Sequence, residues 1–244
     1  MGKTPQLGRS TGFLGLLTSA TLLVGVAVPA IAYRGKAGEA YSFLNHFVSE
    51  LGEVGVSPLA VVFNLTLVLG GLALVPFLVS LALAMRVNLW AKLGSIAGVA
   101  AAAFLALVGV FPMNDYTAHI FVAMNFFRLG LVMILLYTVA VFTQRPAARI
   151  LPNWVNWAGA LSFACFFVFL FVVPGIAKMP AGLLAPSAFP ARPSPLPLAI
   201  SEWSIYFFTM IWIATVSARL AFAGAPRPRS ELRLRAELDD PVGR

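Results

Sequence analysis

The polar groups best suited to chemistry in this chain are concentrated in ten residues, 44–53. Within them His46 and Glu50 stand four residues apart, and Ser49 lies between them. On a helix these three side chains would lie close together, which brings an imidazole, a carboxylate and a hydroxyl within reach of one another. Polar groups this dense beside a membrane are costly to hold in place. The segment is therefore a candidate binding or catalytic site.

A second polar pair, Asp115 and His119, also has a spacing of four residues. That spacing suits an imidazole oriented by a carboxylate, acting as a base or as a metal ligand. Together with His46 and Glu50, the pair would form a ligand set acceptable to zinc or iron. The two pairs come from separate segments, so this ligand set requires a fold that brings them together. A membrane-embedded hydrolase or metalloenzyme that uses these residues is the alternative interpretation. A nucleophilic Ser49 lacks a supporting Gly-x-Ser-x-Gly motif.

Arg128 is the third notable group, because it falls about 16 Å into an apolar segment, near the middle of a membrane. A guanidinium keeps its charge there, so it must reach water or pair with a carboxylate. Asn125, three residues earlier, is its neighbour on a helix. The candidate carboxylate partners are Glu50, Asp115 and Glu202. We expect Arg128 to form either a structural ion pair or an anchor for an anionic headgroup.

The elements that must position these groups are membrane helices. The chain is 60% hydrophobic and only 11% charged, with a mean hydropathy of +0.89, whereas soluble domains are about 25% charged. Six apolar runs are long enough to cross a hydrocarbon core, which takes about 20 helical residues: 13–33, 58–84, 90–111, 117–143, 154–174 and 200–222. Backbone amides cannot stay unpaired in lipid, and the alternation of a barrel is absent. The sequence therefore predicts an all-α fold, with one integral membrane domain of six transmembrane helices over 1–222.

The basic residues indicate the orientation of this bundle. Most of the 17 Lys and Arg residues fall in the termini and in the loops on the same side as the termini. The other loops hold Arg34, Lys36, Lys178 and Arg192. By the positive-inside rule, we expect a multi-pass cell-membrane protein with both termini in the cytoplasm and 223–244 as a cytoplasmic tail. The net charge of +8 then reflects topology and membrane lipid, with no nucleic acid as a partner.

Two local patterns refine this picture. Residues 41–53 show helical spacing, with Phe43, Phe47 and Leu51 at i, i+4 and i+8, which predicts a short amphipathic helix at the membrane interface before the second span. In the third span, Gly94 and Gly98 form a small-xxx-small pair that permits close helix packing and, without other support, an oligomer. Trp154, Trp157 and Trp203 are expected in the interfacial aromatic belts.

Several short motifs carry a resemblance. They are Asn45-His46-x-x-Ser49-Glu50-Leu51-Gly52, Phe63-Asn64, Gly109-x-Phe111-Pro112 with His119, and Glu202-Trp203. In these residues, and over roughly 13–222, the chain resembles a prokaryotic six-helix membrane family known as domain of unknown function nine-nine-eight. The resemblance implies a six-helix bundle. The chain is also distantly similar to DRAM/Sfk-type membrane proteins, which are associated with lipid or membrane trafficking.

The functional hypothesis joins these observations. Most of the polar candidates map to the extracytoplasmic end of the predicted bundle, and the cytoplasmic halves of the spans hold almost no ionisable group. We expect a polar pocket there that binds a lipid or amphiphile; no catalytic residue, metal or cofactor is assigned. Its candidate residues are Asn45, His46, Ser49, Glu50, Asn64, Asp115, His119, Asn125, Arg128 and Glu202. A small transporter is a further alternative.

Overall fold

The computed structural model describes residues 3–86, 88–174 and 194–222, and these are helical or loop, without a strand. Six helical segments are long and apolar enough to cross a membrane, which confirms the predicted all-α, six-span architecture. They are α1 (Lys3–Ala32), α2 (Ala60–Ala84), α3 (Leu89–Val110), α4 (Tyr116–Phe142), α5 (Asn156–Phe167) with its π-helical continuation η4 (Val168–Val172), and α7 (Pro197–Phe222). The predicted tail 223–244 and the connection 175–193 lie outside the described residues.

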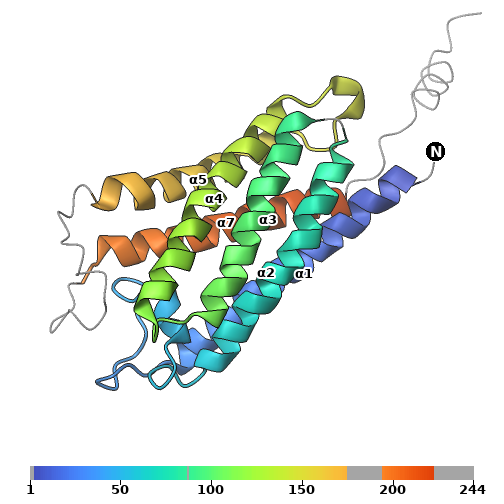
Figure 1. The fold of residues 1–244 in the computed structure, drawn as a ribbon. Helices are drawn as coiled ribbons and strands as arrows, with labels where there is room; N and C mark the ends of the chain where they lie inside the picture. Colours follow the sequence, from blue (N-terminus) through green and yellow to red (C-terminus); the bar gives the residue numbers. More distant parts are fainter. Residues whose placement is uncertain (1–2, 87, 175–193, 223–244) are drawn as a thin grey trace, which may run out of the picture.

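The six helices pack as a closed ring. The closest packing runs from α1 to α2, then to α3, α4, α5 and α7, and from α7 back to α1 (Figure 1). Each helix therefore has two main neighbours, and each turns one side inward and one side to the surroundings. A ring of six helices encloses more space than a four-helix bundle. Its interior has to be filled by large side chains or left partly open.

Small residues allow the closest helix approaches in this ring. A side chain at Gly71 on α2 would lie 2.6 Å from the backbone oxygen of Ala102 on α3, so only glycine fits there. Gly94 packs on Tyr137, and Gly98 packs on Met133 of α4. The glycine pair singled out in the sequence is therefore used for packing within the bundle.

The half of the ring nearer the N-terminus is filled with large side chains. Phe77, Leu78, Tyr137 and Trp212 are each 2% exposed or less, and they come from three different helices. The Tyr137 hydroxyl donates to the backbone oxygen of Leu78 at 3.0 Å, so its polar end is satisfied inside the apolar interior. This packed half forms the floor beneath the open space described below.

The connection between α1 and α2 departs from the prediction. Residues 41–53 do not form an amphipathic α-helix; they fold as turns followed by a single 3₁₀ turn, η1 (Val48–Gly52). His46 and Glu50 are 2% and 1% exposed, where an interfacial helix would have left them in water. We name residues 41–53 the roof segment, because they cover the end of the bundle opposite the N-terminus (Figure 1).

Candidate functional site

The roof segment avoids the α-helix because side chains take up its backbone N–H groups. The N–H of Phe47 donates to Oε1 of Glu50 at 2.8 Å, and the N–H of Ser42 donates to Nδ1 of His46 at 3.2 Å. In an α-helix, each of these N–H groups would instead donate to the carbonyl oxygen four residues earlier. The side chains of His46 and Glu50 therefore stabilise the irregular backbone of the roof segment to which they belong.

Helix α7 anchors the roof segment from below. Oε2 of Glu202 accepts a hydrogen bond from the N–H of Val48 at 2.9 Å. The indole N–H of Trp203 lies 3.0 Å from the Tyr41 hydroxyl and 3.1 Å from the His46 carbonyl oxygen. Trp203 is only 4% exposed, so the prediction that it belongs to an interfacial belt is wrong. It is a buried anchor for the roof.

Two further amides fasten the roof segment and the residues after it. Nδ2 of Asn64 on α2 donates to the carbonyl oxygen of Gly52 at 3.0 Å. Asn114, just before α4, bonds both the N–H and the carbonyl of Val54, at 2.8 and 2.9 Å. The predicted site residue Asn64 therefore contacts the roof backbone. The roof is tied to α2 and to α7, and the residue that follows it is tied to the turn between α3 and α4.

Under the roof lies a cavity inside the ring, which we name the inner cavity. It offers about 80 Å³ to water-sized molecules, well above the roughly 15 Å³ that one water requires. It is lined by Leu22, Val48, Ser49, Phe63, Leu67, Leu105, Val108, His119, Ala123, Phe126, Phe127, Glu202, Ile205, Tyr206, Thr209 and Met210. These residues come from α1, α2, α3, α4 and α7 and from η1.

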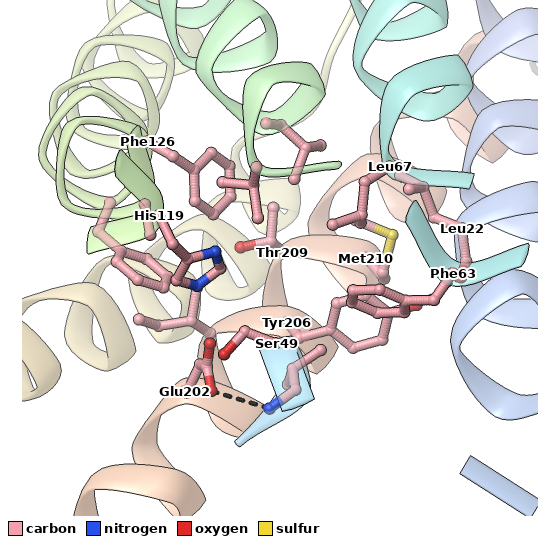
Figure 2. Close-up of a pocket in the computed structure, with 16 residues that line it drawn as sticks. Leu22, Ser49, Phe63, Leu67, His119, Phe126, Glu202, Tyr206, Thr209 and Met210 are labelled. Atoms are coloured by element: carbon pink, nitrogen blue, oxygen red, sulfur yellow. Dashed lines mark hydrogen bonds between the residues drawn. The ribbon is translucent and has the colours of Figure 1, made fainter. Parts of the chain in front are cut away.

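The lining is amphipathic in its arrangement. His119, Glu202 and Ser49 lie together at the side of the cavity next to the roof, whereas Leu22, Leu67 and Met210 line the other side (Figure 2). Of the ten residues predicted for the site, Ser49, His119 and Glu202 line this cavity. The structure thus brings together polar groups from three segments that are distant in sequence.

The hydrogen bonding of His119 defines what its ring offers. Its Nδ1 lies 2.9 Å from the carbonyl oxygen of Phe111. Because a carbonyl oxygen only accepts, Nδ1 carries the proton of the neutral ring, and Nε2 is left as an acceptor. The predicted pairing with Asp115 is wrong. Asp115 is exposed and accepts from the N–H of Ala118 at 3.1 Å, which makes it the N-terminal cap of α4.

Arg128 and Asn125 do not line the inner cavity. The Arg128 side chain is exposed, and within the described residues it takes part in no ion pair, so the expected partnership with Glu50, Asp115 or Glu202 is not formed. Nδ2 of Asn125 donates to the carbonyl oxygen of Phe121 on its own helix at 2.8 Å. Arg128 is nine residues from His119. Nine steps of 100° place the two on opposite faces of α4, and His119 occupies the inner face.

The remaining candidates, Asn45, His46 and Glu50, lie in the roof segment and do not line the cavity. Nε2 of His46 lies 3.8 Å from Oε1 of Glu39. Within the described residues no three His, Cys, Asp or Glu side chains are grouped so that they could hold a metal ion. The four residues of the metalloenzyme hypothesis are therefore divided between the roof, a helix cap and the cavity.

Tyr41 is a half-buried residue of the roof. Its hydroxyl donates to the carbonyl oxygen of Phe47 at 2.7 Å. Burial raises the pKa of the Tyr41 phenol well above its ordinary value, and the nearby carboxylates of Glu202 and Glu50 add to this shift. The phenol therefore remains a neutral donor at every physiological pH.

Two polar residues of the cavity were not identified from the sequence. Tyr206 and Thr209 follow Glu202 at i+4 and i+7, so the three form one stripe on α7. The Tyr206 hydroxyl donates to the carbonyl oxygen of Leu22 on α1 at 2.8 Å, and the Thr209 hydroxyl lies 3.0 Å from that of Ser162. A search for polar groups at helical spacing from Glu202 would have found both.

Comparison with known proteins shows a match between this sequence and one family model. The sequence model of the family described as "Protein of unknown function (DUF998)" matches residues 20–219, a range that includes every residue of the cavity lining. No curated protein and no solved structure matches the chain, so the similarity to DRAM/Sfk-type proteins is not confirmed.

Proposed function

The chain belongs to the DUF998 family of proteins of unknown function, and we propose that this multi-pass membrane protein binds an amphiphilic molecule in its inner cavity. The observation that carries the proposal is the amphipathic lining: Ser49, His119 and Glu202 stand at one side, and the rest of the lining is apolar except for the hydroxyls of Tyr206 and Thr209, which bond to other helices. A pocket with a few convergent polar groups in an apolar wall suits a ligand with one polar end. The hydrocarbon part would lie among Phe63, Leu67 and neighbouring side chains.

The polar groups suggest the chemistry of the headgroup. Nε2 of His119 is an acceptor, and the second oxygen of the Glu202 carboxyl group is not used by the bond to Val48. Among the lining residues there is no Lys or Arg. We therefore assign the cavity to a ligand whose headgroup donates hydrogen bonds, such as a hydroxyl or an amine. The anionic headgroup expected from Arg128 has no cationic partner in this lining.

The alternatives have less support from the geometry. A hydrolase using Ser49 would need an adjacent base, and no hydrogen bond joins Ser49 to His119 in the part of the chain that the structure describes; the Ser49 hydroxyl lies 3.4 Å from Sδ of Met113 instead. A transporter would need polar groups continuing through the bundle. The interior beyond the cavity holds Phe77, Leu78 and other large apolar side chains.

We also propose that the roofed end of the bundle faces the extracytoplasmic side. Among the described residues, Arg34 and Lys36 are the basic groups near the roof, whereas Arg86, Arg145, Arg149 and others cluster at the opposite end. Labelling of intact cells with a membrane-impermeant maleimide tests this in a chain that lacks Cys165. Lys36→Cys should react, and Arg149→Cys should react only after lysis; the reverse pattern contradicts the orientation.

Native mass spectrometry and lipid extraction of the purified protein test the proposed ligand. Ala123 on α4 lines the cavity and is 8% exposed, so Ala123→Phe would place a ring in the space available to the ligand. Ala103 on α3 is exposed to the surroundings of the bundle, and Ala103→Phe is the matched control. We expect a co-purified amphiphile in the wild type and in Ala103→Phe, and its loss in Ala123→Phe.

Two results would overturn the proposal. One is a wild-type protein that carries no amphiphile after extraction in a mild detergent. The other is equal retention in both phenylalanine variants, because the ligand would then lie outside the inner cavity. An extracted molecule with a purely anionic headgroup would contradict the assignment of a hydrogen-bond-donating head.

A further inference from the structure

A second open space lies on the outside of the ring, between α1 and α7. This groove has a volume of about 550 Å³. Its walls are apolar or aromatic: Leu23, Val26, Ala27, Ala30 and Ile31 of α1, Ala40, Tyr41 and Phe43 of the adjoining loop, and Trp203, Tyr206 and Phe207 of α7. We name it the α1/α7 groove. Ile31 is 81% exposed and Phe207 is 43% exposed, so the groove opens away from the bundle.

The groove and the inner cavity share one wall. Tyr206 lines both spaces. On α1, Leu22 lines the inner cavity, while its neighbour Leu23 lines the groove. The hydrogen bond from the Tyr206 hydroxyl to the carbonyl oxygen of Leu22, 2.8 Å long, closes the wall between the two helices at this point.

The surroundings of the groove determine what can occupy it. Both α1 and α7 are helices with the length and hydropathy of membrane spans, so hydrocarbon chains of the bilayer are the material beside them. The polar groups of the wall are already used, since the Trp203 indole bonds the roof and the Tyr206 hydroxyl bonds α1. The surface that the groove leaves open to a ligand is therefore apolar.

We propose that the α1/α7 groove binds the hydrocarbon chain of a membrane amphiphile and is its lateral route from the bilayer into the inner cavity, with Tyr206 as the gate. The inference rests on the proposed function, because it supplies the path for the same ligand. The roof covers the alternative path from water, since it is bonded to α2 and to α7. A molecule that moves through the groove never has to expose its chain to water.

Photo-crosslinking in liposomes tests the groove directly. The probe is a long-chain alcohol with a diazirine in its alkyl chain, added to phosphatidylcholine vesicles that contain the full chain. After illumination, peptide mapping should find label on groove residues of α1 and α7 and, later in time, on cavity residues such as Phe63 and Phe126. Label on the cavity residues before any label in the groove would overturn the lateral route.

Two alanines of α1 supply a matched pair. Ala27 is exposed and lines the groove, and Ala20 is exposed two turns earlier on nearly the same face without lining it. Because both positions are on the surface, a phenylalanine at either one should leave the fold intact. We expect Ala27→Phe to lose the label in the groove and to slow the appearance of label in the cavity. Ala20→Phe should behave as the wild type.

Tyr206→Phe tests the gate, because it keeps the ring and removes the hydroxyl that bonds Leu22. Label should then reach the cavity faster than in the wild type. The control is Tyr116→Phe, which removes a hydroxyl on α4 that lines neither space. An unchanged rate in Tyr206→Phe would overturn the gate.

The outcomes separate this inference from the proposed function. Undiminished labelling of the cavity in Ala27→Phe overturns the lateral route, while the cavity remains a binding site. Labelling of the groove with no label in the cavity of any variant overturns both the route and the proposed function. An unlabelled groove in the wild type, as would follow if another part of the chain covered it, overturns the route alone.

Discussion

The carboxylate of Glu202 accepts a hydrogen bond from the backbone N–H of Val48, 154 residues earlier in the chain, at 2.9 Å. This bond joins the beginning of α7 to the first residue of the 3₁₀ turn in the roof. The same side chain lines the inner cavity. Glu202 therefore has two roles, since it holds the roof in place and supplies a polar group to the space beneath it.

The first prediction concerns this bond. Glu202→Ala leaves a buried backbone N–H without its acceptor, which should lower the free energy of unfolding by about 1–3 kcal/mol. Glu202→Gln keeps a side-chain oxygen as an acceptor and should lose less. Thermal unfolding of the purified variants in one detergent measures the difference. Equal stability of the alanine and glutamine variants would contradict the anchoring role.

The second prediction concerns the indole of Trp203. Trp203→Phe keeps an aromatic ring but removes the donor that lies against Tyr41 and His46. The roof should open more often, so the amide hydrogens of residues 45–50 should exchange faster in a hydrogen-exchange experiment. Trp157→Phe is the control, because Trp157 is 49% exposed on α5. If exchange in the roof is the same in both variants, the indole does not hold the roof.

The third prediction concerns Arg128. Its side chain is exposed on the face of α4 opposite His119, and it does not line the cavity. Arg128→Leu should therefore retain the co-purified amphiphile, and its stability should equal or exceed that of the wild type, since a charge is removed from an apolar helix. Lipid extraction and thermal unfolding measure both effects. Loss of the ligand would restore the anchoring role that the sequence suggested.

The fourth prediction concerns helix packing. Gly71→Ala would place a methyl group against backbone atoms of α3, 2.6 Å from the Ala102 oxygen, and it should cost about 1–3 kcal/mol of stability. A methyl group at Gly8 on α1 would meet no atom within 4 Å. Gly8→Ala should therefore keep or raise stability, because alanine favours the helix. A Gly71→Ala variant as stable as Gly8→Ala would mean that α2 and α3 can separate without cost.

The fifth prediction concerns pH. Burial raises the pKa of Tyr41 in the folded state, while the unfolded phenol ionises near its ordinary pKa of about 10. Neutral Tyr41 therefore makes its full contribution to the free energy of unfolding below the unfolded pKa of about 10. This contribution is lost as the pH rises toward the pKa of the folded state. Tyr41→Phe cannot ionise, so its free energy of unfolding should fall less steeply above pH 10. Parallel slopes in the two proteins would contradict the raised pKa of Tyr41.

The sequence alone was enough to predict the number and type of the spans. An apolar run of about 20 residues must be helical in a membrane, because its backbone groups have no other partner there. This rule acts on each segment separately. It therefore identified all six spanning helices without knowledge of how they pack.

The tertiary structure decided which polar groups face the cavity. Helical spacing places His119 and Arg128 on opposite faces of α4, but only the closed ring shows that the histidine face is the inner one. In the roof, helical spacing was present, yet the backbone N–H groups bond side chains, one of them on α7. Periodicity describes a single segment. The choice between a helix and a bonded loop, or between an inner and an outer face, depends on partners that lie far away in the chain.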